Sequence, residues 1–256
     1  MSDDIAACAA NLAKGDPYRF AGVMAARPEA RDVLFPLFAF NLEVARAPWV
    51  TEESMIAEMR LQWWRDALQE IAEGGEVRRH EVVTPLAGVL SPRATTLLDD
   101  LILARRWEIY REPFEDSAAF EDYIDKTCGN LLVVAAQSLG TAEESVVRDF
   151  AFANGIANWL RAIPELEARK RVPLVDGRPE TVAKLARGAL DRLKTARRNR
   201  RAVDRVAGQA LYGGWQAEAL LKQAASDPDR VKSGTLGTSD FARHLGLMRR
   251  AVTGRW

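Results

Sequence analysis

Hydrophobic residues recur with a helical period along most of this chain, and no other feature limits the fold as strongly. The clearest stretch lies between residues 120 and 139. Its apolar positions are Phe120, Tyr123, Ile124, Thr127, Cys128, Leu131, Leu132, Ala135, Ala136 and Leu139. Steps of three and four residues place these side chains on one helical face. No alternating run of Val, Ile, Thr and aromatic residues is long enough to predict a sheet. The pattern therefore predicts an all-α protein.

Further helices are expected at residues 3–13, 28–47, 51–73, 93–111, 144–163, 179–198, 200–224 and 239–250. Proline stands where these segments start or break, at Pro17, Pro28, Pro92, Pro179 and Pro228. The chain has 256 residues and shows neither a repeat nor a low-complexity linker. We therefore expect one domain that covers residues 1–256.

Charge and cysteine content narrow the class of protein. The 36 basic residues balance the 36 acidic ones, so overall charge gives no reason to expect nucleic-acid binding. The N-terminus is acidic and lacks the two regions of a signal peptide. The longest uncharged run, residues 127–142, is too short to span a bilayer. Cys8 and Cys128 provide no disulfide framework. These features predict a soluble, cytoplasmic protein.

Common metal and phosphate motifs are absent from the sequence. Neither His80 nor His244 has a second ligand at zinc spacing, and no glycine-rich phosphate loop occurs. Glu121 and Asp125 lie one helical turn apart, which is one way to hold a divalent ion. We favour the alternative that both face solvent near the start of a helix, where acidic groups interact well with the helix dipole.

Two tryptophans occur together in the segment 51–73. Trp63 shares a predicted helical face with Ile56 and Met59, which favours a core position for Trp63. Trp64 lies four residues from Arg60, close enough for a cation–π contact.

A basic stripe is expected along residues 187–205. It consists of Arg187, Asp191, Lys194, Arg198, Arg201 and Arg205. Such a stripe is usually a solvated helix face, and it could also contact anionic lipid or an acidic partner.

A polar line runs along the otherwise apolar helix predicted at 144–163. Asn154, Asn158 and Arg161 are separated by four and three residues, so they share one face. A polar line of this kind either faces water or lines a cavity.

Four segments together resemble the squalene/phytoene synthase family over residues 15–175. They are "DPYRFAGVMAARPEARDVLFPLFAFNLEVARA", "MRLQWWRDAL", "YIDKTCGNLL" and "NGIANWLRAIPELEARKRVPL", in the family's order and spacing. The resemblance implies an isoprenoid synthase-like helical bundle around a central cavity, which Asn154, Asn158 and Arg161 would face. It also implies that active relatives join two prenyl diphosphates head to head, with Mg²⁺ held by two aspartate-rich motifs.

The first aspartate motif of the family maps onto "ARAPW". Ala45, Arg46 and Trp49 stand where aspartates are expected, and Arg19 replaces a serine near Phe20. Arginine in place of an acid inverts the local charge, which favours an anion over Mg²⁺. Pairing of Arg46 with Glu43, Glu165 or Glu167 is the alternative, and both remain open.

The second motif matches the family at Asn158 and Arg161 but carries Ala162 and Leu166 at its aspartate positions. Glu165 is one residue out of register, a rotation of about 100° on a helix. Pro48 and Pro164 are expected to end or kink the two motif helices.

These departures resemble a divergent branch of the family that includes a mitochondrial assembly factor for respiratory complex I. We expect a non-catalytic binding or assembly protein with no metal ligand and no cofactor. Its ligands would be a prenyl or other lipid-like molecule and a protein partner in respiratory-complex assembly, with peripheral contact to the inner membrane through the basic stripe. The candidate cavity residues are Arg19, Phe20, Arg46, Trp49, Asn154, Asn158, Arg161 and Arg171.

The alternative hypothesis is a head-to-head prenyltransferase with an unorthodox diphosphate site. That site would use Arg19, Arg46, Arg161 and Arg171 and would require Mg²⁺.

Overall fold

A computed structural model describes residues 2–110 and 112–256. Its α-helices are α1 (Asp3–Gly15), α2 (Pro17–Met24), α3 (Pro28–Arg46), α4 (Ser54–Glu73), α5 (Val83–Ala87), α6 (Pro92–Arg105), α7 (Trp107–Tyr110), α8 (Ser117–Ile124), α9 (Asn130–Leu139), α10 (Glu144–Ala168), α11 (Pro179–Arg198), α12 (Ala217–Ser226), α13 (Asp229–Lys232) and α14 (Asp240–Thr253). A π turn, η2 (Asp125–Gly129), joins α8 to α9, and η1 (Ala47–Trp49), η3 (Arg200–Ala202) and η4 (Ala207–Gly214) are 3₁₀ segments. No described residue forms a β-strand, and Ala142 pairs with Val203 only as an isolated bridge. The predicted all-α class is confirmed.

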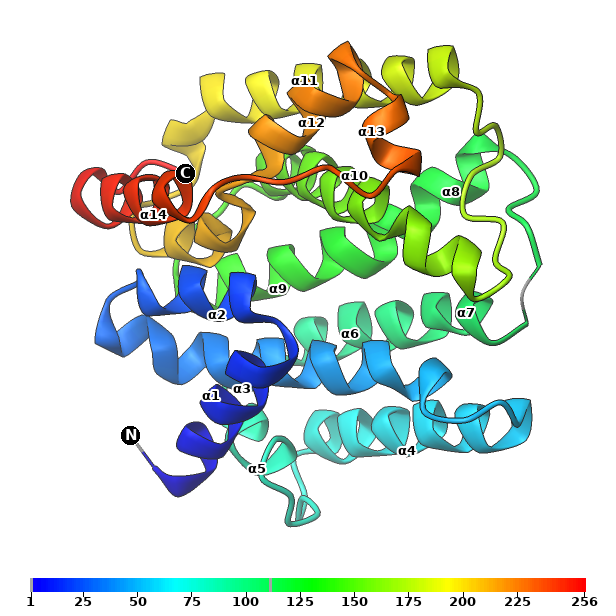
Figure 1. Cartoon of the computed structure of the whole chain (residues 1–256). Helices are drawn as coiled ribbons and strands as arrows, with labels where there is room; N and C mark the ends of the chain where they lie inside the picture. Colours follow the sequence, from blue (N-terminus) through cyan, green and yellow to red (C-terminus); the bar gives the residue numbers. More distant parts are fainter. Residues whose placement is uncertain (1, 111) are drawn as a thin grey trace.

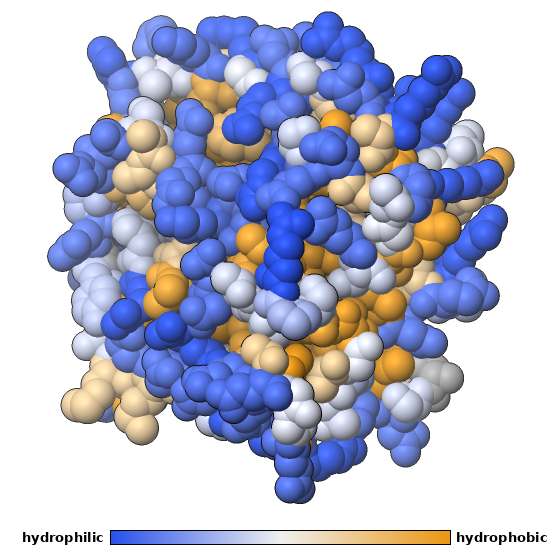
Figure 2. All heavy atoms as spheres, turned by 180° about the vertical axis from the view of Figure 1, so that it is seen from behind, coloured by the Kyte–Doolittle hydropathy of each residue, from blue (hydrophilic) through white to orange (hydrophobic). Residues whose placement is uncertain are grey.

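The helices stack in layers across the molecule. Figure 1 shows α4 and α5 at one end, α11 and α12 at the other, and α3, α6, α9 and α10 between them. α10 packs against α11 and α12, while α9 packs against α3 and α6. Seen from behind, hydrophobic residues gather through the centre of the face and hydrophilic ones surround them (Figure 2). No helix in residues 2–110 or 112–256 combines the length and apolarity needed to cross a membrane.

α3 forms much of the core because apolar side chains cover several of its faces. Phe35, Phe38 and Phe40 are at most 2% exposed, although they point in different directions around the helix. A helix that is apolar all round must be enclosed by other helices. α3 is therefore surrounded by its neighbours, and its C-terminal end leads into η1 at the cavity.

The helix predicted at 200–224 is wrong. The segment is divided into the 3₁₀ segments η3 and η4 and the helix α12. Glycines explain the break, because η4 packs backbone to backbone against α2, a helix that was not among the predicted ranges. A Cβ on Gly22 would lie only 2.6 Å from Gly213 Cα.

Pro164 does not end its helix, which was one of the two outcomes expected of it. α10 continues from Glu144 through Pro164 to Ala168. The wide packing of α10 against its neighbours offsets the backbone hydrogen bond that proline cannot donate. Pro36 is likewise accommodated inside α3.

The predicted core face of α4 is wrong at Ile56 and Met59, while Trp63 packs against the core. Met59 and Ile56 are exposed, and Trp63 is only partly buried, with the Arg78 guanidinium 4.7 Å from its ring centroid. The buried face instead contains Leu61 and Trp64, and the Trp64 ring meets Phe40 edge-on.

Candidate functional site

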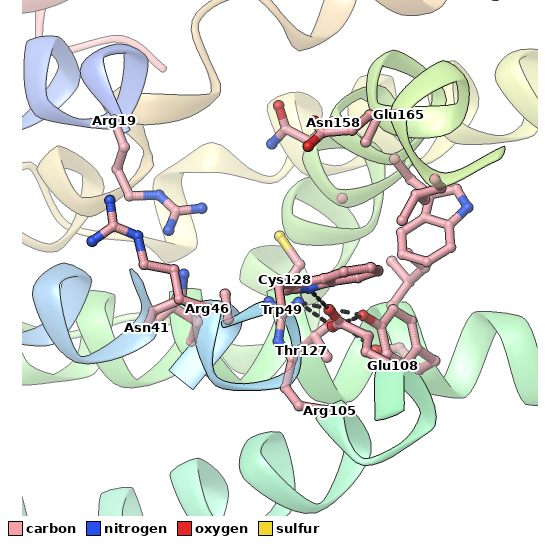
Figure 3. Close-up of a pocket in the computed structure, with 18 of the residues that line it drawn as sticks. Arg19, Asn41, Arg46, Trp49, Arg105, Glu108, Thr127, Cys128, Asn158 and Glu165 are labelled. Carbon is pink, nitrogen blue, oxygen red and sulfur yellow. Dashed lines mark hydrogen bonds and ion pairs between the residues drawn. The ribbon is translucent and has the colours of Figure 1, made fainter. Parts of the chain in front are cut away.

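A cavity of about 410 Å³ lies between α2, α3, η1, α6, α7, η2 and α10. Arg19, Arg46, Trp49 and Asn158 are among the side chains that line it, as the sequence analysis expected. They come from four different elements and converge on one space (Figure 3). Phe20, Asn154, Arg161 and Arg171 are not among its lining residues.

The π turn η2 shapes one wall of this cavity. It presents Thr127 and Cys128 to the cavity, one turn beyond Tyr123 of α8. Thr127 Oγ1 donates a hydrogen bond of 2.6 Å to the Tyr123 carbonyl oxygen, which helps to satisfy the backbone where the α-helical pattern is interrupted. The sequence indicates the apolar face of this region but carries no signal for the π turn.

Phe20 and Asn154 support the wall from behind. The Phe20 ring stacks on Phe35 with centroids 5.9 Å apart. Asn154 is buried, and its Oδ1 accepts a hydrogen bond of 3.3 Å from Asn158 Nδ2. The polar line on α10 thus begins inside the protein and reaches the cavity at Asn158.

Arg161 turns away from the cavity, although it was expected to point into it. Its guanidinium lies 4.6 Å from the ring centroid of Tyr18, and Nη2 donates to Asn158 Oδ1 over 3.4 Å. Burial lowers the pKa of Arg161 from the usual arginine value. Arg161 therefore connects α10 to α2 beside the cavity.

Trp49 is enclosed by charged groups. The guanidinium carbons of Arg169 and Arg171 each lie 4.9 Å from its ring centroid. Its indole Nε1 donates a hydrogen bond of 2.7 Å to Glu108 Oε2. Arg171 therefore belongs to the site through Trp49, although Arg171 itself does not line the cavity.

A buried acid–base cluster around Glu108 was missed by the sequence analysis. Glu108 is 4% exposed, and Oε1 accepts hydrogen bonds from Arg105 Nη1 at 2.6 Å and from the Tyr123 hydroxyl at 2.5 Å. Burial lowers the pKa of Arg105, but the adjacent Tyr123 and Glu108 outweigh this effect and raise it. Burial, followed by the Glu108 charge, raises the pKa of Tyr123 well above its usual value. The only sequence signal was an Arg–Glu pair at i, i+3.

Arg46 pairs with Glu43, as expected from the second of the two alternatives that the sequence left open. Its Nη1 lies 3.6 Å from Glu43 Oε1 and donates to Asn11 Oδ1 over 3.2 Å. Asn11 Nδ2 in turn donates to Glu43 Oε1 over 2.7 Å. These contacts fix Arg46 at the cavity without burying it, because its side chain is 41% exposed.

Cys128 contributes a thiol to the cavity wall. Burial raises its pKa, although the nearby positive charge of Arg19 opposes this effect. The thiolate is the reactive form of cysteine, so a raised pKa makes Cys128 a poor nucleophile.

The side chains that line the cavity are not suited to bind Mg²⁺. Its lining includes two carboxylates and four arginines, which are Glu108, Glu165, Arg19, Arg46, Arg105 and Arg169. Glu108 already accepts hydrogen bonds from Arg105, Tyr123 and Trp49, and Glu165, with its side chain 70% exposed, pairs with Arg169 over 2.7 Å. Magnesium sites in proteins rely on carboxylate oxygens that remain available to the ion. No group of three potential metal ligands occurs anywhere in the described part of the chain.

The solvated alternative holds for Glu121 but not for Asp125, which is partly buried in the π turn η2 and paired with an arginine. Glu121 is exposed, and Asp125 Oδ2 accepts a hydrogen bond of 2.7 Å from Arg148 Nη1. The residues of the basic stripe at 187–205 are also exposed, and within it Lys194 pairs with Asp191 over 3.0 Å.

Curated relatives match part of the chain. The complex I assembly factor 6 homolog of Drosophila melanogaster is 29% identical over 156 residues, covering 57% of this chain and 46% of the relative. The human complex I assembly factor 6 is 24% identical over 148 residues, covering 56% of this chain and 44% of the relative. The chain thus spans less than half the length of these relatives.

Solved structures share the fold over almost the whole chain. A dehydrosqualene synthase crystallised with a ligand superposes with a TM-score of 0.77 at 13% identity, covering 98% of this chain and 95% of that one. A squalene synthase from Alicyclobacillus acidocaldarius gives a TM-score of 0.69 at 16% identity, covering 87% and 93%. The family model for squalene/phytoene synthase matches residues 12–246. With the helical bundle and its central cavity, this match shows that the chain belongs to the squalene/phytoene synthase family.

Proposed function

We propose that this protein is a non-catalytic member of its family, a binding protein that acts in the assembly of a respiratory complex. The composition of the cavity carries this proposal. Arg46 and Trp49 stand where the resemblance places aspartates of the first motif, and both are held by neighbouring side chains. Ala162 and Leu166 take the corresponding places in the second motif.

The chemistry of the family explains why these substitutions matter. Ionising an allylic diphosphate requires cations that neutralise the charge that develops on the leaving group. Arginines can bind a phosphate, but they do not gather the metal ions that the family reaction uses. The retained carboxylates, Glu108 and Glu165, each neutralise an arginine. The cavity therefore favours binding of an anionic or lipid-like ligand without bond cleavage.

The names of the relatives support the role in assembly. The matching proteins from fly and human are complex I assembly factors, while the synthases share the fold at identities below 20%. We therefore place this protein with the assembly branch, as a cytoplasmic protein that works at the inner membrane.

The first experiment tests for catalysis. The purified chain is incubated with farnesyl or geranylgeranyl diphosphate, Mg²⁺ and NADPH, with an active squalene synthase as the positive control. We expect no C30 or C40 product by mass spectrometry. A product that disappears when EDTA is added would overturn the proposal in favour of the prenyltransferase alternative.

The second experiment tests for the partner. A tagged copy is expressed in the native host, crosslinked and captured, with an unrelated tagged helical protein as control. We expect enrichment of subunits of the NADH dehydrogenase complex and a lower complex I activity in a strain that lacks the gene. Normal complex I in that strain, with no subunit enriched, would refute the assembly role.

The four cavity arginines favour one feature of the alternative function, namely a site for a prenyl diphosphate. Arg161 and Arg171 lie outside the cavity lining, so only Arg19 and Arg46 of the four arginines first considered are in place for it. An anion site without a metal remains compatible with the binding role.

A further inference from the structure

α14 carries a row of apolar side chains on its outer face. Phe241, Leu245, Met248 and Val252 are exposed by 76, 50, 58 and 73%. Their separations of four, three and four residues align them along one side of the helix. None of the residues of α14, all of which the structure describes, is buried.

The opposite side of α14 holds the helix to the protein. Arg250 Nη2 donates to the Trp215 carbonyl oxygen over 3.2 Å, and Arg205 Nη2 donates to the Val252 carbonyl oxygen over 3.4 Å. Gly246 faces the Trp215 ring, where an added Cβ would lie 3.7 Å from a ring carbon. The partly buried residues of α14 are Arg243, Gly246, Leu247 and Arg250, so Leu247 is the one large apolar side chain of the helix that is partly covered, and the apolar row faces outward.

This orientation is the reverse of that of an ordinary surface helix, whose apolar face packs on the core. Exposure of an aligned apolar row costs free energy in water, and such rows commonly mark an interaction surface. Figure 1 places α14 at one edge of the molecule.

The charges beside the row indicate what that surface is. Arg249 is exposed and lies within one helical turn of both Leu245 and Val252. Arg255 and Arg205 are exposed near the C-terminal end of the helix. The acidic residue of the helix, Asp240, pairs with Arg243 over 3.0 Å. A cationic flank beside a short apolar row is typical of helices that lie in the plane of an anionic membrane.

A second copy of this chain fits the row less well. Two apolar rows brought together would also bring their cationic flanks together, and like charges across an interface oppose association. Anionic headgroups, by contrast, complement these arginines.

We propose that α14 lies flat on an anionic lipid surface, with Phe241, Leu245, Met248 and Val252 in the outer acyl region and Arg249, Arg255 and Arg205 at the phosphates. This surface shares Arg205 with the basic stripe at 187–205 and contains no residue that lines the cavity. The inference does not depend on whether the cavity is catalytic.

The test is flotation of the full-length protein with vesicles of phosphatidylcholine alone or with about one third phosphatidylglycerol. The decisive variant is F241S/V252S, which changes two exposed side chains. Loss of two apolar side chains from the lipid contact should reduce partitioning at least tenfold. M55S/M59S on α4 is the matched control, because Met55 and Met59 are also exposed, at 72 and 66%. We expect the control to bind like the wild type, and circular dichroism verifies that both variants are folded.

The charge component is tested with R249E and with added salt. Both should weaken binding to anionic vesicles, because each reduces attraction to the headgroups. Equal binding to neutral and anionic vesicles, or equal losses in F241S/V252S and M55S/M59S, would overturn the proposal. Absence of vesicle binding, with dimerisation or partner binding that F241S/V252S abolishes, would also overturn it and assign the row to a protein.

Discussion

Trp49 Nε1 donates a hydrogen bond of 2.7 Å to Glu108 Oε2, and this bond joins the 3₁₀ segment after α3 to the short helix α7. The same carboxylate accepts hydrogen bonds from Arg105 and Tyr123. One buried negative charge therefore holds three elements together around the cavity. The three donors thereby fix the position of the Glu108 side chain in the cavity wall.

Glu108→Gln should destabilise the protein because Arg105, with its side chain only 17% exposed, would keep its charge and lose its counter-ion. Removal of one partner of a buried ion pair costs about 3–5 kcal/mol. Urea denaturation measures the loss. Glu165→Gln is the control, because its partner Arg169 is at the surface and such pairs contribute about 1 kcal/mol or less. Equal losses in the two variants would contradict the prediction.

Mg²⁺ should not raise the affinity of the cavity for a farnesyl or geranylgeranyl diphosphate analogue. Its arginines repel the ion, and its two glutamates are paired. Isothermal titration calorimetry with and without Mg²⁺ measures the difference. An affinity that rises with Mg²⁺ and falls on chelation would show a functional metal site.

Arg19→Ala should weaken the binding of pyrophosphate or sulfate. Arg19 lines the cavity, and a charge-assisted hydrogen bond contributes about 1.5–3 kcal/mol, which corresponds to a loss of roughly tenfold or more. Arg46→Ala should act in the same direction, with a smaller effect because the Arg46 side chain is 41% exposed and that of Arg19 only 19%, so solvent screens Arg46 more. Arg161→Ala should have the smallest effect of the three, because Arg161 faces Tyr18. Lys194→Ala, an exposed change on α11, is the control. Equal anion affinity in wild type and all variants would leave the cavity without an anion site.

Glu218 should make stability depend on pH in the acidic range. Hydrogen bonds from Lys222 and then Arg197 lower its pKa from 4.5 to about 2. The unfolded chain therefore takes up the proton first as pH falls. This contribution to the free energy of unfolding is complete above about pH 4.5 and is lost as pH decreases towards 2. Urea unfolding of wild type and Glu218→Gln should differ at pH 6 and converge near pH 2. A difference that is constant over this range would refute the assignment.

Gly22→Ala and Gly188→Ala should have opposite effects on stability. The new methyl at position 22 would lie 2.6 Å from Gly213 Cα, so α2 must move away from η4, at a cost of about 1–3 kcal/mol. At position 188 nothing lies within 4 Å of the new methyl, and α11 should gain about 0.5–1 kcal/mol from the better helix former. Thermal and urea unfolding of the two variants measure whether each substitution lowers or raises the free energy of unfolding. Similar shifts in the same direction would contradict the described packing of α2 on η4.

The sequence predicted helices well where an amphipathic period and a start signal coincide. The predicted range 179–198 matches α11, which begins at Pro179. Prediction failed at 200–224, because the close approach of Gly22 and Gly213 joins segments almost 200 residues apart and has no local signal. On α4 the period was found but the wrong face was chosen, since Trp63 and Trp64 are both plausible core residues.

The candidate site was only partly predictable for a similar reason. The position of Asn158 along α10 was enough to predict that it lies at the cavity. The direction of the Arg161 side chain, however, depends on the contact between its guanidinium and the ring of Tyr18 on α2. Glu108 was missed because an isolated glutamate in a helical segment usually faces solvent. Its burial follows from the convergence of Trp49, Arg105 and Tyr123, which only the tertiary structure brings together.

The π turn between α8 and α9 fixes how far the side chains of α9 are rotated about the helix axis relative to those of α8. A π turn holds one residue more than an α-helical turn, and one residue corresponds to about 100° of rotation. Tyr123 before the turn reaches Glu108, while Asn130 after it donates to the Leu97 carbonyl oxygen over 2.9 Å. Loss of a single residue from 125–129 would keep the segment helical yet leave only one of these contacts in register. The length of this short turn, more than its composition, therefore determines which side chains the cavity can present.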